Sequence, residues 1–428
     1  MELGEKIGII QQFLESHQFA DNGIAYSMLR DCGDEFRPWQ PEDLEGKSLR
    51  QFKFKGGREQ DRIVSGADWL NNENSTYFSG SCLFAQVRCY EATRNPSALE
   101  ECKRALRSLK GISALPPERS FGWLCKPFGM MVTTESSPDQ NLAAVSGMRA
   151  YLPHADDADR DWIISMICAI AGYWHRIDYQ LDFGHIFWDM RKSPGHMRIM
   201  QVINQVAFEL EGDSHYSEVA AGLAAEYGEI SSGESSQFDL MQRLNPAIFS
   251  NWTTTSEAAS AGLLFVLHCG RLLIDLAPEN RKTLLAAMER ALLHGLIGFD
   301  ESTHMHRYYQ QVRKDADGLH WRPLPEDFDE PIRTGVPFFE ASRDLFYLDP
   351  TSRFPAAYSI YLTCGGDPNS HYEGIWKTIM GELDFSRLHW FIAGNEIDLS
   401  RDYLFSGITS ELSNYLVAYW LGKSQGLC

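Results

Sequence analysis

The sequence has too few basic residues for a nucleic-acid-binding protein. It carries 39 Lys and Arg against 58 Asp and Glu, which gives a formal net charge of −19. DNA and RNA need a basic protein face to neutralise their phosphates, and anionic membranes likewise attract basic segments. The charge therefore argues against nucleic acid or a membrane as partner. It still allows a short anionic sugar held by one or two local cations.

Long apolar runs and paired cysteines are missing as well. No window approaches the roughly 18 apolar residues of a membrane span. Residues 1–18 lack the basic start and the cleavage site of a signal peptide. The nine cysteines are odd in number and scattered, and none forms a C-x-x-C pair. We read them as reduced thiols and expect a cytoplasmic protein.

Strand-like alternation is rare, and its best example is residues 179–188. Helical periodicity dominates instead. Proline stands at the first helical position after Asn95, Ser193 and Ala277, which marks three helix starts. The periodicity predicts twelve helices, over residues 3–17, 76–93, 96–113, 139–152, 157–178, 194–211, 214–229, 256–273, 277–297, 354–365, 370–383 and 405–423.

These helices come in pairs with short turns inside each pair and longer loops between pairs. Short turns at one end and long loops at the other are typical of a closed ring of hairpins, and loops gathered at one end form a mouth. We therefore predict an all-α fold, an (α/α)6 toroid, as a single domain over residues 1–428. An extended excursion is expected at 19–75 and a long functional insertion at 299–353. An open solenoid is the alternative, although no fixed repeat length supports it.

Six segments carry a resemblance to a known group of proteins: residues 77–106, 122–129, 135–148, 179–190, 196–216 and 419–427. In their order and over most of the chain, they resemble the six-hairpin glycosidase superfamily. The resemblance is to uncharacterised bacterial members related to the unsaturated-uronyl (glucuronyl or rhamnogalacturonyl) hydrolases. It implies the toroid and a carbohydrate-active enzyme. Because that superfamily contains hydrolases, epimerases and lyases, the fold does not fix the reaction.

The segment ESSPDQ, residues 135–140, is the most informative part of the resemblance. Members of this kind tend to place an aspartate here, at the mouth end of an inner helix. The resemblance therefore implies that Asp139 is catalytic and that Gln140 beside it contacts the substrate. The same residues also form a helix start, where a carboxylate caps free amides and meets the positive end of the helix dipole. The two roles can coexist.

A second group of candidates follows the hairpin that ends near residue 178. In the unsaturated-uronyl hydrolases an Asp–Gln pair or paired acids protonate a vinyl ether and position water. On this resemblance Asp182 and His185 are further catalytic candidates. The second carboxylate stays open between Asp182, Asp68, Glu257 and Glu340. The run of His and aromatic residues that follows the catalytic aspartate in those hydrolases is absent here.

Aromatic residues are plentiful in the non-helical segments. Aromatic rings stack on the apolar faces of sugars, although a large ring can equally plug a loop onto the core. A nearby Lys126 or Arg191 could hold a uronate carboxylate. The expected substrate-binding residues, besides Gln140, are Trp123, Lys126, Trp188, His304, His306 and Trp321.

We expect neither a metal nor another cofactor. No phosphate-binding glycine loop is present, and His304 with His306 lacks a third ligand at motif spacing. The acidic run at 156–161 is better explained as the first turn of a helix. The expected function is hydrolysis of a small, uronate-type saccharide by acid/base catalysis. The alternatives are a sugar isomerase similar to N-acylglucosamine 2-epimerase, with bases among His185, His304, His306 and His389, and a non-catalytic sugar-binding toroid. The oligomeric state stays open.

Overall fold

The structure of the chain is a computed structural model. It describes residues 2–27, 29–32, 35–40, 42, 48–49, 64–65, 74–115, 121–127, 136–182, 187–230, 252–255, 258–300, 305–306, 310–323, 352–382, 405–406 and 410–428. Within these ranges lie twelve α-helices and short strands, and the helices match the twelve that the periodicity predicts.

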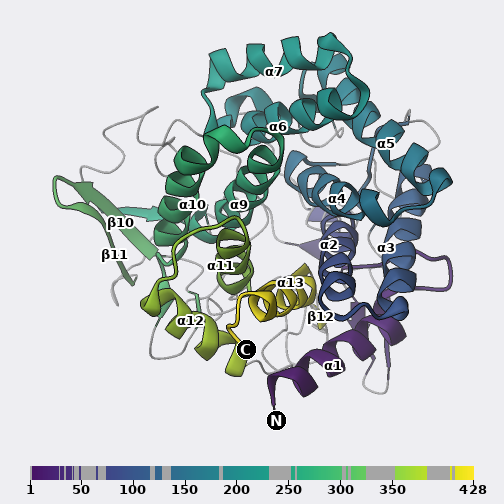
Figure 1. Cartoon of the computed structure of the whole chain (residues 1–428), viewed down its shortest axis with the longest axis horizontal. Helices are drawn as coiled ribbons and strands as arrows, with labels where there is room; N and C mark the ends of the chain where they lie inside the picture. The colour runs from purple at the N-terminus through teal and green to yellow at the C-terminus, as the bar shows by residue number, and fades with distance from the viewer. Residues whose placement is uncertain are drawn as a thin grey trace.

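Six helices form a closed inner ring. Each packs against the next in the order α2, α4, α6, α9, α11 and α13, and α13 packs against α2 to close the circle, as Figure 1 shows. Their bounds are α2 Ser75–Thr93, α4 Pro138–Tyr151, α6 Pro194–Glu211, α9 Ala258–Leu276, α11 Arg353–Thr363 and α13 Ser410–Ser424.

The other six helices surround this ring. Five follow their inner partners directly in the chain, while α1 packs against α13 and so pairs the two ends of the sequence (Figure 1). Their bounds are α1 Leu3–Phe13, α3 Pro96–Ala114, α5 Asp157–Arg176, α7 Ser214–Tyr227, α10 Arg281–Gly295 and α12 Ser370–Gly381. The predicted all-α ring of six hairpins with adjacent terminal helices is therefore confirmed.

Side-chain caps start the outer helices at the tight turns. Asn95 precedes Pro96 and accepts a bond from the backbone nitrogen of Ser97 at 3.1 Å. Asp156 accepts one from the Asp159 nitrogen at 2.9 Å. These bonds satisfy amides that have no partner inside the helix. The acidic run at 156–161 is thus a helix start, as the sequence predicts.

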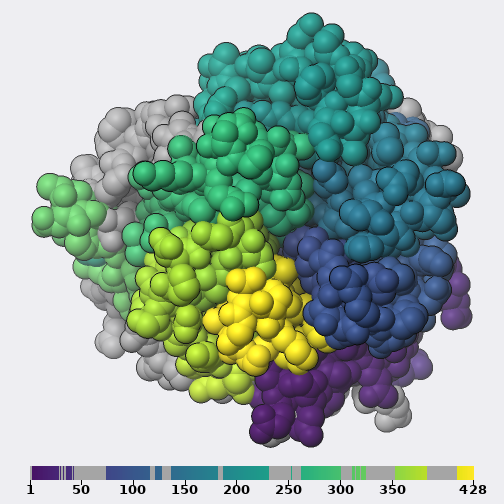
Figure 2. Space-filling model, in the orientation of Figure 1, coloured from purple at the N-terminus to yellow at the C-terminus, as the bar shows by residue number. Residues whose placement is uncertain are grey.

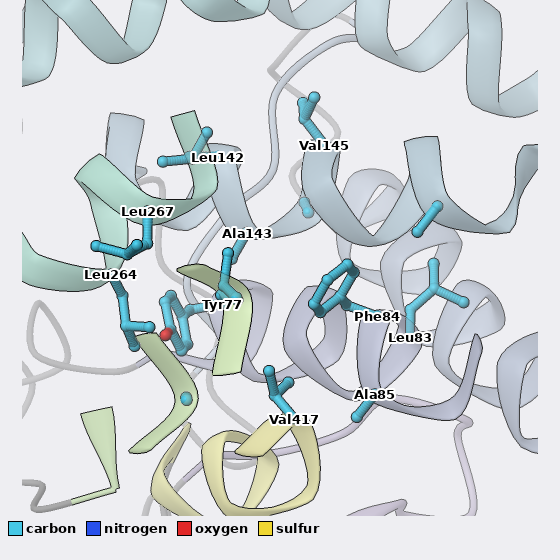
Figure 3. Packing of buried hydrophobic residues seen from close by; sticks show 14 of the residues in the cluster. Tyr77, Leu83, Phe84, Ala85, Leu142, Ala143, Val145, Leu264, Leu267 and Val417 are labelled. Atoms are coloured by element: carbon cyan, nitrogen blue, oxygen red, sulfur yellow. The ribbon is translucent and has the colours of Figure 1, made fainter. Parts of the chain in front are cut away.

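The inner helices meet so closely that glycine is required between α2 and α4. A Cβ atom on Gly80 would lie 2.5 Å from the backbone of Ala143, and one on Gly147 would collide with the carbonyl oxygen of Gly80. Apolar side chains from four inner helices, α2, α4, α9 and α13, pack in the interior of the ring (Figure 3). They belong to one core cluster, which includes Tyr77, Leu83, Phe84, Leu142, Val145, Leu264, Leu267 and Val417.

The strands are short and lie in the connections between hairpins. A three-stranded sheet, β12–β1–β2, joins the N-terminal excursion to the segment before α13, and a second one, β11–β10–β7, extends from the ring beside α10 (Figure 1). Three two-stranded sheets, β3–β4, β5–β6 and β8–β9, complete the set among the residues that the structure describes. The strands are β1 Leu29–Asp31, β2 Phe36–Pro38, β3 Ser48–Leu49, β4 Val64–Ser65, β5 Gln180–Asp182, β6 Phe187–Asp189, β7 Thr253–Thr255, β8 Phe299–Asp300, β9 Met305–His306, β10 Gln310–Asp315, β11 Gly318–Pro323 and β12 Phe405–Ser406.

The ring has two different ends. At one end every inner helix begins, and long connections lead into it; we call this the long-loop end. At the other end every inner helix except α13 passes through a short turn into its outer partner, at 94–95, 152–156, 212–213, 277–280 and 364–369; we call this the short-turn end. All six inner helix dipoles therefore point their positive ends to the long-loop end.

None of the described helices has the length and hydropathy needed to cross a membrane. All nine cysteines are free thiols, seven of them buried and two, Cys32 and Cys428, exposed.

Candidate active site

Three inner helices bring their first turns together at the long-loop end. Asn74 immediately precedes α2, Asp139 and Gln140 are in the first turn of α4, and His196 is in the first turn of α6. The Gln140 side-chain amide donates to the Asn74 Oδ1 atom at 3.0 Å, which ties the start of α4 to that of α2. The site is therefore built on rigid helix starts.

Lys126 is held in place by the start of α2. The Thr76 hydroxyl donates to the carbonyl oxygen of Cys125 at 2.8 Å, and the Ser75 hydroxyl donates to that of Pro127 at 3.2 Å. The backbone on both sides of the lysine is thus fixed. The lysine itself is half-buried.

His196 is the residue where these charges meet. Burial lowers the pKa of its imidazole, the carboxylate of Asp139 raises it, and the ammonium of Lys126 lowers it. The His196 Nδ1 atom is buried and has no hydrogen-bond partner within the described part of the chain. The lowered pKa keeps the imidazole mainly neutral at pH 7, and the charges of one carboxylate and one ammonium group act on it, a combination suited to moving a proton.

Asp139 does not cap its own helix. Ser137 occupies the N-cap position, and Asp139 is the second helical residue of α4. The Asp139 side chain is half-buried and makes no hydrogen bond to any residue that the structure describes. Its carboxylate thus keeps its hydrogen-bonding capacity for a substrate, and the positive end of the α4 dipole stabilises its charge.

Trp123 differs from the prediction. Its side chain is fully buried, and its ring centroid lies 4.9 Å from that of Tyr173 and 5.7 Å from that of Trp174. Burying a ring of this size against α5 stabilises the fold by about 2–3 kcal/mol, which explains its inward position. Trp123 therefore supports the wall behind the site, and its ring is not open to a sugar.

Gln140 and Arg191 also have structural partners. Gln140 is only 1% exposed and bonds to Asn74, so it positions the helix starts and is closed to solvent. Arg191 pairs with Asp189 at 2.9 Å and with Asp178 at 2.5 Å. Its charge is already balanced by these two carboxylates.

Trp188 lies on the β5–β6 hairpin, which follows α5 and so belongs to the long-loop end. Its side chain is 41% exposed, and the neighbouring Phe187 is 51% exposed. Asp182 pairs with Phe187 across this hairpin, although its side chain lies outside the described part. An exposed aromatic pair is suited to stacking on a sugar.

Two further candidates, Trp321 and His306, lie on strands of the insertion. Trp321 is half-buried on β11 opposite Val312, and His306 lies on β9 opposite Phe299 with its side chain not described. His185, His304, His389, Asp68 and Glu340 fall outside the described residues, as does Glu257. Their predicted roles stay predictions.

No metal site appears in the described residues. Among them, no three His, Cys, Asp or Glu side chains are grouped so as to hold an ion. The prediction that no metal is needed remains untested, because His304 lies outside those residues.

His196 is the residue that the sequence analysis missed. It follows Ser193 and Pro194, a helix start of the same form as Ser137 and Pro138 before Asp139. Two similar starts on inner helices of one ring must share an end, and this signal could have placed the histidine beside the aspartate.

Fold and site together define a toroid of helical hairpins with an acid/base cluster at its long-loop end. No protein-family model matches the chain, and no curated protein matches its sequence. Among solved structures it is similar to a D-mannose isomerase, at 11% identity and a TM-score of 0.49, over 99% of this chain and 97% of that one. It is also similar to an unsaturated glucuronyl hydrolase specific for heparin, at 10% identity and a TM-score of 0.43, over 90% and 94% of the two chains.

Proposed function

We propose that the long-loop end is the active site of an enzyme that acts on a small saccharide by acid/base catalysis. One observation carries the proposal: Asp139, without a hydrogen-bond partner among the described residues, and the half-buried imidazole of His196 interact electrostatically at the starts of two neighbouring helices. A carboxylate and a neutral imidazole in one site can divide the roles of acid and base.

The first reaction we propose is hydrolysis of a glycosidic bond next to a uronate. The positive ends of the inner helices and the Lys126 ammonium favour a substrate carboxylate at this end. Asp139 then serves as the catalytic carboxylate that exchanges a proton with the substrate or its attacking water. The exposed Trp188 offers a ring on which a sugar can stack.

The second candidate reaction is isomerisation of a free sugar, and His196 is the observation that favours it. A neutral imidazole can remove the proton from the carbon next to the carbonyl of an open-chain sugar and return it to the neighbouring carbon. The enediolate formed between these steps is negative, so the Lys126 ammonium and the helix starts would stabilise it.

The test is a substrate panel with two readouts. Unsaturated and saturated uronyl disaccharides report hydrolysis through newly formed reducing ends. Free aldoses and ketoses in D2O report isomerisation through deuterium at the carbon next to the carbonyl. We expect Asp139→Asn to abolish the activity that the wild type shows, while the matched control Asp157→Asn, on an exposed first turn at the short-turn end, retains it.

The pH dependence tests His196 separately. Because burial lowers the pKa of this imidazole, the group stays neutral to lower pH than a free histidine, whose pKa is about 6.5. Activity should therefore persist at pH values somewhat below 6.5 and fall at more acid pH. The His196→Gln variant should have no activity. If wild-type protein binds saccharides but turns over none of the panel, the chain is a sugar-binding toroid and the enzyme proposal is wrong.

We also propose that the chain folds as one domain and works in the cytoplasm. One core cluster draws on every helix pair of the ring, which supports the first statement. The nine free thiols support the second.

A further inference from the structure

A cavity of about 310 Å³ lies at the opposite end of the ring from the proposed active site. Its walls come from the last turns of α2, α9, α11 and α13, joined by Arg281 at the start of α10. Because α2 and α9 stand across the ring from each other, the cavity lies near the ring axis. Figure 2 views the molecule in the same orientation as Figure 1 and shows α13 between α11 and α2. The residues that line it and carry the argument are Phe84, Arg88, Arg271, Arg281 and Trp420.

Two arginines from opposite helices are gathered on one ring. The guanidinium carbon of Arg88 lies 5.0 Å from the ring centroid of Phe84, and that of Arg271 lies 4.8 Å from the same centroid. The two charges are like and would repel each other. Cation–π contact with a shared ring holds them together, and Arg281 adds a third cation to the wall.

Buried hydrogen-bond donors in this wall lack acceptors. The Nε atoms of Arg88 and Arg271 and the Nε1 atom of Trp420 are buried and have no partner within the described part of the chain. Arg271 is only 8% exposed. A buried donor without an acceptor costs about 1–3 kcal/mol, and such groups in native proteins require an explanation.

The carboxylates nearby do not use these donors. Asp275 accepts from the Arg271 Nη1 atom at 3.1 Å, and Glu91 accepts from the Arg88 Nη1 atom at 2.5 Å. Both carboxylates are partly exposed, at 50% and 34% of their side-chain surface. Burial lowers the pKa of Arg271 to about 10, which still leaves the group charged at pH 7. The wall thus carries three cations against two acids in a protein of net charge −19.

Capping of helix ends does not account for the arrangement. Arginines near helix C-termini often bond to the last carbonyl groups. In the described residues Arg271 instead bonds to Asp275 and to Ser146 in the middle of α4, and Arg88 bonds to Glu91. The C-terminal helix ends would by themselves repel an anion, so any anion here depends on the arginines.

We propose that this cavity, which we call the axial arginine pocket, binds a small molecule that carries an oxyanion, either a phosphate or a carboxylate. Oxygen atoms of such a group would bind to the guanidinium groups that line the cavity, and a rotation of Arg88 or Arg271 toward the ligand would also give the unpartnered Nε donors an acceptor. Arginine is the side chain best suited to bind planar carboxylates and phosphates. The volume exceeds that of a single ion, since a water molecule occupies about 30 Å³. The cavity therefore has room for the organic part of a small ligand beside Phe84 and Trp420.

The test is calorimetric titration of the full chain at constant ionic strength. The probes are inorganic phosphate, glycerol 3-phosphate and succinate, with potassium chloride as the reference. We expect saturable binding of at least one probe, and the preference between glycerol 3-phosphate and succinate identifies the oxyanion. Arg88→Gln should weaken it by a factor of about 10 or more, as expected for a lost charge-assisted bond. Arg281→Gln, at the exposed edge, should weaken it a few-fold.

Two controls keep the result specific. Arg160→Gln removes an exposed arginine from the first turn of α5, at the same end of the ring but outside the pocket, and should leave binding unchanged. Asp139→Asn should also leave binding unchanged, so this result is independent of the proposed active site. Arg271→Gln removes a buried charge and is used only if it unfolds like the wild type. The absence of saturable binding for every probe, or equal binding by Arg88→Gln and the wild type, would overturn the proposal.

Discussion

The two ends of the ring use the same helices for opposite electrostatic tasks. At the long-loop end, where the inner helices begin, a carboxylate, Asp139, is stabilised by positive helix ends and lies near His196 and Lys126. At the short-turn end, where they finish, Arg88 and Arg271 lie among negative helix ends. Each end thus places the charge that its helix dipoles favour.

The lengths of the connections at the two ends determine which parts of the chain can form a binding site at each end. Long connections at one end supply extra groups, such as Lys126 and the β5–β6 hairpin with Trp188, around the helix starts. Tight turns at the other end supply almost none, so its groups come from the helices themselves. The axial arginine pocket is therefore lined mainly by helix side chains, whereas the proposed active site combines helix starts with loops.

The largest expected effect is found by measuring turnover and oxyanion binding in one variant from each end of the ring. Asp139→Asn should lower turnover by about 10²–10⁴-fold, the usual range for a lost acid/base group, with unchanged stability. Arg88→Gln should leave turnover within a few-fold of wild type while it weakens oxyanion binding by a factor of about 10 or more. Steady-state kinetics and calorimetry on both variants check this. A loss of both properties in each variant would show that the ends are one functional unit.

A second prediction concerns the crossing of α2 and α4 that connects the ends. Gly80→Ala should destabilise the fold by about 1–3 kcal/mol, because the new methyl group meets the Ala143 backbone and the helices must separate. Denaturant unfolding measures the loss. The control is Gly222→Ala on α7, where a Cβ meets nothing within 4 Å, and helix propensity predicts a gain of up to about 1 kcal/mol. Equal stability of Gly80→Ala and wild type would contradict the close packing.

A third prediction concerns His268, which donates to or accepts from the Ser146 hydroxyl at 3.0 Å. Burial, with the Arg271 charge, lowers its pKa from 6.5 to about 3. The neutral imidazole contributes fully to the free energy of unfolding above pH 6.5. This contribution is lost as the pH falls toward 3, because in that range the unfolded chain binds a proton at His268 and the folded chain does not. The slope is about 1.4 kcal/mol per pH unit.

Urea unfolding between pH 6 and pH 4 checks this slope. In wild type the free energy of unfolding falls as the pH is lowered. His268→Gln should make this fall smaller by about 1.4 kcal/mol per pH unit. The matched control is His371→Gln on the exposed start of α12, for which we expect the wild-type slope. An unchanged slope in His268→Gln would show that the buried imidazole already titrates as it does in the unfolded chain.

The sequence could predict the ring because helices carry their own signals. The twelve helix positions follow from periodicity and from starts such as Asn95 with Pro96, and the alternation of short and long connections predicts closure. Asp139 was proposed from the resemblance of the ESSPDQ segment, and its place in a helix start also follows from the sequence. Trp123 was misplaced because a loop has no periodicity that tells an inward ring from an outward one, and the aromatic surface of α5 decided its position.

The groups that sequence reasoning missed depend on contacts across the ring. The sequence shows the helix start that carries His196, but the proximity of His196 to Asp139 follows only from the packing of α4 against α6. Arg271 interrupts an apolar helix, a visible signal, yet its partner Phe84 is 187 residues away in the chain on the opposite helix. Pattern rules act within a few turns, so they cannot supply such pairs.

The smallest expected effect is at the edge of the long-loop end, where Trp188→Ala tests the aromatic part of the comparison. The ring is 41% exposed, so its removal should change the free energy of unfolding by no more than about 0.5 kcal/mol. If the ring stacks on a sugar, KM should rise by about 5–10-fold, which corresponds to about 1 kcal/mol of lost contact, while kcat stays nearly constant.

The matched control for Trp188 is Phe208→Ala, because Phe208 is also 41% exposed but lies near the end of α6, toward the short-turn end. Both variants lose an aromatic ring of equal exposure. A difference in KM between them would therefore come from where the ring lies in the fold, and not from the loss of an exposed aromatic side chain. An equal KM in Trp188→Ala and Phe208→Ala would remove the aromatic hairpin from the proposed site. Asp139, His196 and Lys126 would then be the groups that distinguish this end of the ring.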